Sequence, residues 1–291
     1  MYQTMTTRIA IDLGGTNLRA ARVRNGQIEA SLQEPCLANG TQNEVLEQII
    51  QMISRLNHSS VERIGIAVPS IVDYKKGIVY HVQNIPSWTE VHLKDILEQR
   101  FNLETRVDND VNCFVAAENV LGAGQPFRDF VGITLGTGVG AGIVINNEVY
   151  RGVHTGAGEI GCIPYLDSIY EDYTSSQLFN KWHTTGQQEA LKAAQGDQAA
   201  LEKWKELGFH LGKLLQVILY AYNPEAIIIG GGISLSHSLF EQSMYESMHE
   251  KFLFPKEPEG VQIIFSKPVS YTHLTLPTIL RSCRSRWSPY H

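Results

Sequence analysis

Two short runs of glycine and threonine, each placed between apolar strands, restrict most strongly how this chain can fold. The first run, IDLGGT, contains Asp12, Gly14, Gly15 and Thr16. Glycines let the backbone turn tightly and approach a ligand closely, and successive N–H groups in such a turn form a cradle for anions. The carboxylate of Asp12 stands where it could hold a hydrated cation. A plain hairpin turn explains the same residues equally well.

A second run, TLGTGVGAG, repeats the pattern further along the chain. It places Thr134, Gly136, Thr137 and Gly138 between one apolar strand and the next. One such turn is common, but two of them predict a pair of related sheet domains that hold one polyphosphate. No other internal repeat is found.

The remaining periodicities indicate an α/β architecture, because strands alternate with amphipathic helices. In the first half we expect three strands within residues 8–33, a helix at 42–57, a strand at 64–68, a helix at 92–101 and a strand at 104–108. Further on we expect a strand hairpin at 130–146, a helical region at 173–222, a strand at 226–229, a helix at 236–253 and a strand at 261–265. Within the helical region we expect a helix at 175–182, a stretch rich in Gln, Ala and Lys, and a helix at 201–222.

Composition excludes several classes of protein. The 291 residues are enough for two domains, and the net charge of −6 argues against a nucleic-acid partner. There is no long apolar window, and the first residues lack the apolar core of a signal peptide, so we expect no membrane contact and a cytoplasmic protein. The four cysteines form no CxxC pair, which predicts reduced thiols: Cys36, Cys113, Cys162 and Cys283.

Polar residues follow one predicted strand and interrupt one glycine-rich segment. Asn109 and Asp110 come directly after the strand at 104–108, where ligands of open α/β sheets collect. They also suit the start of a helix, where Asn and Asp cap free N–H groups. Glu159 lies among glycines, where a carboxylate can approach a polar ligand, whereas His154 is interpreted as a surface-loop histidine.

The last residues differ from the rest of the chain. Residues 267–291 show neither helical spacing nor strand alternation, and they are basic in an acidic protein. Part of this segment reads like the translation of a sequencing-library adapter. We therefore interpret 267–291 as a non-native readthrough tail and exclude it from the fold.

Taken together, the order and spacing of the motifs resemble those of ROK sugar kinases, a branch of the actin-like, hexokinase-type ATPase fold. The resemblance covers residues 8–266 and rests on seven segments: DLGGT, GIAVPSIVD, NIPSW, DNDVN, TLGTGVGAGIV, GAGEIG and AIIIGGGIS. It implies two lobes, residues 1–112 and 113–266, each with a central mixed sheet flanked by helices. It also implies an active site in the cleft between the lobes and a homodimer.

The resemblance further implies an ATP-dependent kinase that phosphorylates the 6-hydroxyl of a hexose such as glucose or an N-acetylhexosamine. Asp110 is then the general base. The sugar is expected to contact Asn84, Asn109, Asp110, Glu159 and Glu171. ATP is expected to contact Asp12, Gly14, Gly15, Thr16, Thr134, Gly136, Thr137, Gly138, Gly231 and Gly232. Asp12 is expected to hold Mg²⁺ through water.

Two departures from the family pattern change these expectations. Cys162 stands where a histidine is usual, and the cysteine cluster that normally follows is missing, so we expect no structural zinc. The small-residue helix that ends the family pattern is also missing.

Two other classes of function compete with the kinase. A sugar-binding sensor or regulator without catalysis is the stronger alternative. A repressor would carry a DNA-binding segment ahead of Asp12, which we do not expect from the eleven residues there. An ATPase of the actin or chaperone type is disfavoured by the sugar-facing segments NIPSW and DNDVN.

Overall fold

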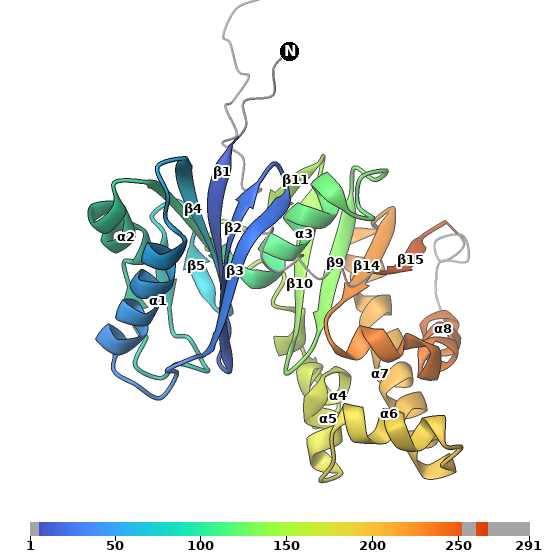
Figure 1. The fold of residues 1–291 in the computed structure, drawn as a ribbon. Helices are drawn as coiled ribbons and strands as arrows, with labels where there is room; N and C mark the ends of the chain where they lie inside the picture. The colour runs from blue at the N-terminus through green and yellow to red at the C-terminus, as the bar shows by residue number, and fades with distance from the viewer. Residues whose placement is uncertain (1–5, 252–259, 267–291) are drawn as a thin grey trace, which may run out of the picture. The chain divides into compact units, whose positions relative to one another are not determined.

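The computed structural model describes residues 6–251 and 260–266, which form two compact units. The first unit runs to Ala117 and the second begins at Glu118, so the division falls inside helix α3 (Asp110–Leu121), a few residues after the expected boundary. Each unit contains a five-stranded sheet with parallel and antiparallel neighbours, which confirms the predicted α/β class (Figure 1). The expected non-native tail, 267–291, lies outside the described residues.

The sheet of the first unit brings the ends of three parallel strands to one edge. Its order is β3-β2-β1-β4-β8, with β1, β4 and β8 parallel. The strands are β1 (Thr7–Leu13), β2 (Asn17–Arg24), β3 (Gln27–Pro35), β4 (Val61–Val68) and β8 (Glu104–Asn109). A smaller sheet contains β5 (Ile71–Asp73), β6 (Ile78–Tyr80) and β7 (Glu90–Val91). Parallel strands end together, so the residues that follow β1, β4 and β8 are neighbours.

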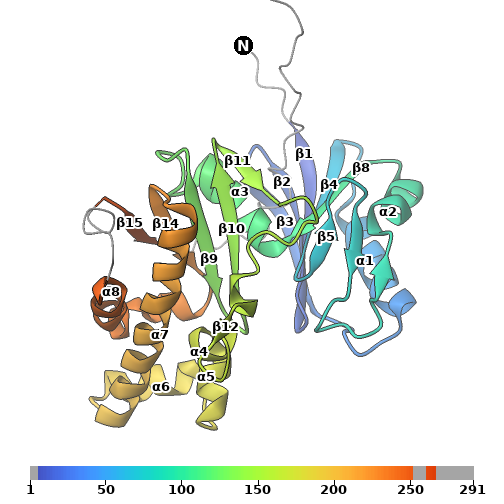
Figure 2. The same cartoon turned by 180° about the vertical axis from the view of Figure 1, so that it is seen from behind.

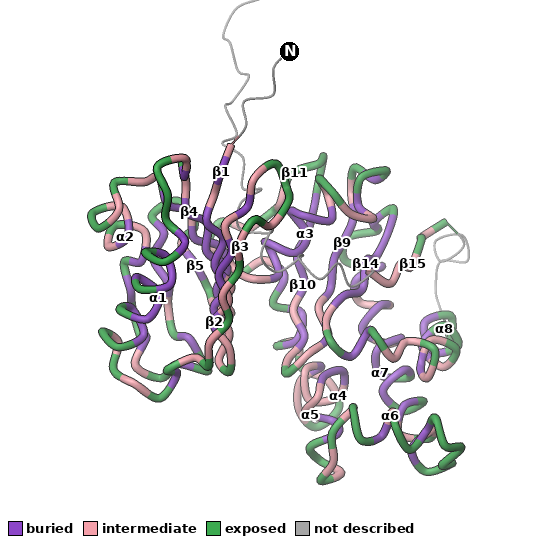
Figure 3. The backbone as a smooth tube through the Cα atoms, in the orientation of Figure 1, coloured by how far each residue is buried: buried purple, intermediate pink, exposed green. Residues whose placement is uncertain are grey.

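Helices α1 (Gln42–Leu56) and α2 (Leu93–Phe101) contribute their apolar residues to the core of this sheet. Helix α1 begins with a capping box, in which Glu44 N–H donates to Thr41 Oγ1 (3.3 Å) and Thr41 N–H donates to Glu44 Oε2 (2.7 Å). Val45, Ile49 and Ile53 recur at helical spacing and are fully buried. Figure 3 shows buried and exposed segments alternating along α1. The predicted helix at 42–57 is thus confirmed.

The second unit repeats the arrangement with a sheet of order β11-β10-β9-β14-β15. The strands are β9 (Phe130–Leu135), β10 (Val139–Ile145), β11 (Glu148–Tyr150), β14 (Ala226–Gly230) and β15 (Gln262–Phe265). β9, β14 and β15 are parallel, and Gly230 pairs with Thr134. The carboxyl ends of β9 and β14 therefore lie together.

The helical stretch expected at 173–222 is divided into short helices and one long one. These are α4 (Glu171–Thr174), α5 (Ser176–Lys181), α6 (Gly186–Ala194) and α7 (Gln198–Tyr222). The divisions follow capping residues, because Ser175, Thr185 and Asp197 each accept a hydrogen bond from the backbone of the next helix. The apolar residues of α7 share one core with β9 and β14. Figure 2 shows the ribbon of α7 beside these two strands.

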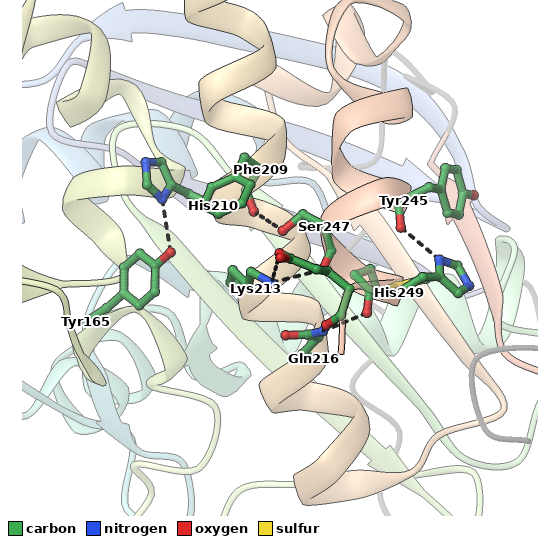
Figure 4. A network of polar contacts seen from close by, with 10 residues as sticks. Tyr165, Phe209, His210, Lys213, Gln216, Tyr245, Ser247 and His249 are labelled. Carbon is green, nitrogen blue, oxygen red and sulfur yellow. Dashed lines mark hydrogen bonds and ion pairs between the residues drawn. The ribbon is translucent and has the colours of Figure 1, made fainter. Parts of the chain in front are cut away.

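The last described helix, α8 (Glu241–His249), is shorter than the predicted helix at 236–253. Its expected first turn belongs instead to a 3₁₀ segment, η2 (Ile233–Leu239), and residues 252 and 253 lie outside the described ranges. Polar contacts join α7 to α8: Ser247 Oγ donates to the carbonyl of Phe209 (2.7 Å), and Gln216 Nε2 donates to that of Met248 (2.8 Å) (Figure 4). Within the described ranges, no helix combines the length and the apolar character needed to cross a bilayer.

The close approach of α7 and α8 depends on glycine at position 212. A Cβ there would overlap the carbonyl oxygen of Met244 and would lie 2.8 Å from the nitrogen of Met248. We therefore expect Gly212→Ala to lower the free energy of unfolding by about 1–3 kcal/mol, as overpacking does. Ordinary helix propensity predicts the opposite sign, a gain of about 1 kcal/mol.

Urea unfolding of both variants checks this expectation, with Gly186→Ala as the matched control. A Cβ at Gly186 would have its nearest neighbour at 3.4 Å, an ordinary contact. Gly186→Ala should leave the chain as stable as before or slightly more stable. A stabilising effect of Gly212→Ala would contradict the packing described here.

Candidate functional site

The first glycine turn is a tight hairpin between β1 and β2. Gly14 N–H donates to the carbonyl of Asn17 (2.9 Å), and the carbonyl of Thr16 accepts from Cys36 N–H (2.9 Å). Asp12 pairs with Arg19 across the hairpin, with 3.2 Å between Asp12 Oδ2 and Arg19 Nη1. The hairpin interpretation is therefore correct. It leaves the predicted ligand role possible, because a tight turn can still present its N–H groups.

Asn84 lies directly against this turn. A Cβ on Gly15 would overlap the side chain of Asn84, so glycine is what lets the two segments meet. Asn84 is exposed, while Ile85 and Trp88 in the same segment are buried, and Trp88 N–H donates to the carbonyl of Ile85 (2.9 Å). The two apolar residues thus anchor a loop that keeps one amide side chain beside the glycine turn.

Asn109 caps helix α3 at the end of β8. Its Oδ1 accepts from the backbone N–H groups of Val111 (2.9 Å) and Asn112 (3.1 Å), and its Nδ2 donates to the carbonyl of Ser70 (3.2 Å). The capping interpretation of this residue is therefore correct. An amide nitrogen carries two hydrogens, so Asn109 can cap the helix and still offer a donor to a ligand.

Asp110, the expected base, is the first residue of α3. It is half-buried, and its Oδ1 accepts from Val111 N–H (2.9 Å). Asn109, immediately before it, pairs with Val68 at the end of β4, and Asp12 pairs with Ala67 one position earlier on that strand. Asp110 therefore follows β8 at the same sheet edge as the first glycine turn.

Asp108 is a residue of this edge that the sequence reasoning did not single out. It is buried, and its Oδ1 accepts from Asn109 N–H (2.9 Å) and from Asn112 Nδ2 (3.2 Å). These two bonds hold the backbone before Asp110 and the side chain of Asn112 after it. A signal was present in the sequence, because an Asp at a strand end followed four residues later by Asn suits such a link.

The second glycine turn is held by hydrogen bonds to residues of α4 and α5. Gly136 N–H donates to the carbonyl of Gly138 (3.0 Å), and the carbonyl of Gly136 accepts from Ser176 N–H (2.9 Å). Val139 N–H donates to Oε2 of Glu171 (3.1 Å), and a Cβ on Gly138 would overlap that carboxylate. Glu171, expected as a sugar ligand, is thus also a support of the turn.

Glu159 and Cys162 lie in the electrostatic neighbourhood of Glu171. Partial removal from water, and then the like charge of Glu171, raise the pKa of Glu159 above its usual value. Loss of hydration, followed by the charges of Glu159 and Glu171, raises the pKa of the Cys162 thiol. The second unit therefore presents two neighbouring carboxyl groups, one of which, Glu171, lies against the turn at 136–138.

Gly231 lies beside the second turn, whereas Gly232 is exposed. Gly231 has a left-handed φ of +92°, and a Cβ there would overlap the backbone of Leu135. Thr134, on β9, pairs with Gly230, and Ser234 Oγ donates to the carbonyl of Gly231 (2.7 Å). The third glycine segment and the second turn thus meet at one end of this sheet.

Metal-binding groups are sparse in the part of the chain that the structure describes. No cluster of three or more His, Cys, Asp or Glu side chains able to hold a metal ion occurs within it. Cys36 and Cys162 are free thiols, Cys113 is buried, and Cys283 lies outside the described residues. His154 is exposed, as the sequence predicts.

A buried histidine near α4 also escaped the sequence reasoning. His210 lies on α7, and its Nδ1 is 3.0 Å from the hydroxyl of Tyr165 (Figure 4). Removal from water, and then the positive charge of Lys181, lower the pKa of His210 from 6.5 to about 4. The two partners are far apart in sequence, so no local pattern could have joined them.

Residues 8–270 match the sequence model of the ROK family, which is most of the chain. The chain therefore belongs to the ROK family.

Proteins similar to this chain include both kinases and regulators. A glucokinase of Halalkalibacterium halodurans is 27% identical over 293 residues, which is 87% of this chain and 88% of that protein. A xylose repressor of Bacillus spizizenii is 29% identical over 242 residues, which is 77% of this chain and 62% of that protein.

A solved structure confirms the actin-like, hexokinase-type fold expected from the sequence. It is a ROK family glucokinase from Streptomyces griseus in complex with glucose and AMPPNP. The two chains superpose with a TM-score of 0.79 at 27% identity, over 92% of this chain and 96% of that one.

The depressed pKa of His210 predicts how stability changes with pH. Between about pH 6.5 and pH 4 the unfolded chain binds a proton at this residue that the folded chain excludes, so stability falls as the pH is lowered. The contribution is complete above the unfolded pKa. Because His210 is only 7% exposed, we expect it to account for a loss of about 3 kcal/mol across this window.

Urea unfolding between pH 4 and pH 7 tests this expectation. The variant His210→Gln keeps an acceptor for Tyr165 but cannot titrate, so its stability should depend less on pH in this window. His154→Gln, at an exposed loop position, is the control and should leave the pH dependence unchanged. Equal slopes for the unmodified chain and His210→Gln would contradict the assignment.

Proposed function

We propose that this chain is an ATP-dependent sugar kinase that phosphorylates the 6-hydroxyl of a hexose, glucose or a related hexose or N-acetylhexosamine, with Asp110 as general base. The observation that carries the proposal is the edge of the first sheet. Strands that end there lead to the first glycine turn and to Asn109 and Asp110, and Asn84 contacts the turn. This supplies an anion cradle, amide groups for hydroxyls and a carboxylate within one unit.

The similarity to kinases supports the same conclusion. The Halalkalibacterium protein is named a glucokinase, and the Streptomyces structure contains glucose together with AMPPNP, an ATP analogue. Identity near 27% favours a shared reaction more than a shared substrate, since hydroxyl stereochemistry is read by small displacements of side chains. The proposal therefore extends to hexoses as a class.

In the proposed reaction the sugar is oriented by hydrogen bonds and deprotonated by a carboxylate. Asn84 and Asn109 would donate to hydroxyl oxygens, and Glu159 and Glu171 would accept from hydroxyl groups. Asp110 would accept the proton of the primary hydroxyl as its oxygen attacks the terminal phosphorus of ATP. The bonds that Asp108 makes on both sides of Asp110 would hold the base in place.

The nucleotide would be held mainly by backbone groups. The turns at 14–16 and 136–138 would offer N–H groups to phosphate oxygens, and Thr16 and Thr137 would add hydroxyl groups. Thr134 lies next to the second turn. Gly231 and Gly232 would allow adenosine to approach the backbone closely. The only acidic candidate among these residues is Asp12, which fits Mg²⁺ because this ion prefers oxygen ligands and keeps much of its water. Mg²⁺, when bound with ATP, offsets charge on the phosphates.

The replacement Asp110→Asn tests the role of the base. It keeps size and hydrogen-bonding capacity but cannot accept the proton, so sugar-dependent ATP turnover should fall by about 10²–10⁴-fold. Binding of an ATP analogue, measured by calorimetry, should be unchanged.

Asp95→Asn is the matched control, because Asp95 is an exposed carboxylate on α2. Its turnover should equal that of the unmodified chain. Near-normal turnover by Asp110→Asn would remove Asp110 from the proposed role.

A sugar-binding regulator without catalysis is the second candidate, because a xylose repressor covers 77% of this chain at 29% identity. A coupled kinase assay and a binding assay with glucose, mannose, fructose, N-acetylglucosamine and N-acetylmannosamine separate the two. Turnover with any of these sugars supports the kinase. Saturable binding of a sugar without turnover, in the presence of ATP and Mg²⁺, supports the regulator.

A further inference from the structure

We propose that Tyr165 and His210 form a positioning pair that holds Glu171 in place and, through Glu171, the turn at residues 136–138. The inference deepens the proposed function and rests on it, because the turn is assigned there to phosphate binding. Neither residue is expected to touch a substrate. Their role is to fix the side chain of Glu171, which is proposed to contact the sugar.

The first step of the argument is the pair itself, which links two distant parts of the second unit. Tyr165 lies on the short strand β12 (Pro164–Tyr165), which pairs with β13 (Ser168–Ile169) just before α4. His210 lies on the buried side of α7, and the hydroxyl of Tyr165 is 3.0 Å from its Nδ1. The hydrogen bond thus joins the hairpin that precedes Glu171 to a core helix.

The second step is the direction of that hydrogen bond. Burial raises the pKa of Tyr165 to about 12, and the pKa of His210 is lowered to about 4, so both groups are neutral near pH 7. A neutral imidazole carries one ring proton, and the carboxylate of Glu206, 3.9 Å from Nε2, favours that proton on Nε2. Nδ1 is then the acceptor, and the hydroxyl of Tyr165 donates to it. Lys181 on α5 is the nearby cation.

The third step is a stack of aromatic rings that surrounds the pair. Tyr165 stacks on Tyr170 with 4.1 Å between ring centroids and meets Tyr173 edge-to-face at 5.5 Å. His210 lies 4.9 Å from the ring of Tyr173, and Lys181 Nζ lies 3.9 Å from the centroid of that ring. Tyr170 and Tyr173 flank Glu171 in sequence, so the stack fixes both sides of this residue.

The fourth step is the contact between Glu171 and the turn. Val139 is the first residue after the turn, and its N–H donates to Glu171 Oε2 at 3.1 Å. A carboxylate on a four-residue helix has little support from the helix itself, since one helical turn is marginal alone. The aromatic stack and its hydrogen bond to α7 supply that support. Removing the hydroxyl of Tyr165 should therefore weaken the hydrogen bond between Glu171 and Val139 N–H.

The experiment removes only the hydroxyl of Tyr165. Tyr165→Phe keeps the stacked ring, so the fold should persist while the link to His210 is lost. We expect the KM values for ATP and sugar to rise by about 3–10-fold, the size of one net hydrogen bond, with a smaller change in kcat. Tyr150→Phe, at an exposed position on β11, is the control and should behave like the unmodified chain.

A second readout does not require activity. Amide hydrogen exchange at Val139 should become about 3–10-fold faster in Tyr165→Phe, while exchange at Ile143, further along β10, should be unchanged. This measurement separates the two ideas. A chain that phosphorylates no sugar would overturn the proposed function, yet faster exchange at Val139 alone would still support the positioning pair.

A third variant tests whether the effect passes through Glu171. In a Glu171→Ala background the contact to Val139 is absent, so adding Tyr165→Phe should cause little further change in KM or in exchange at Val139. Full additivity of the two replacements would overturn the proposal. So would a Tyr165→Phe variant in which Val139 exchanges as in the unmodified chain, or in which all amides of the unit exchange faster to the same degree.

Discussion

The pairing of parallel strands is the interaction on which both candidate sites depend. In the first unit β1, β4 and β8 run side by side, and the hydrogen bonds between them bring Asp12, Ala67 and Asp108 into one row. In the second unit the pairing of Gly230 with Thr134 does the same for β9 and β14. Residues that are far apart in sequence become neighbours because their strands end at the same edge.

Much of this arrangement could be predicted because its signals are local. Helix α1 follows from its spacing of apolar residues and its cap, and the hairpins follow from glycine turns between apolar strands. In the helical stretch at 173–222 the sequence indicates helices at 175–182 and 201–222, which correspond to α5 and to most of α7. It does not distinguish α4 and α6 as separate helices.

The site residues likewise divide into those that local sequence motifs indicate and those whose contacts depend on packing. Asn84 and Glu171 could be named from motifs, but their contacts with Gly15 and Val139 depend on packing between segments that no periodicity connects. Tyr165 and His210 carried no motif, and their hydrogen bond spans 45 positions. Asn109 shows that capping a helix does not exclude the proposed contact with a sugar, because an amide that caps a helix keeps a donor to spare.

The surroundings of Cys162 have a consequence for the chemistry of this surface. Its thiol is exposed, yet partial desolvation and the charges of Glu159 and Glu171 raise its pKa and so lower the fraction present as thiolate. Since oxidants and alkylating reagents attack the thiolate, this accessible cysteine is a slow target. Two acidic neighbours thereby give the protein a measure of protection from peroxide and maleimide at this position.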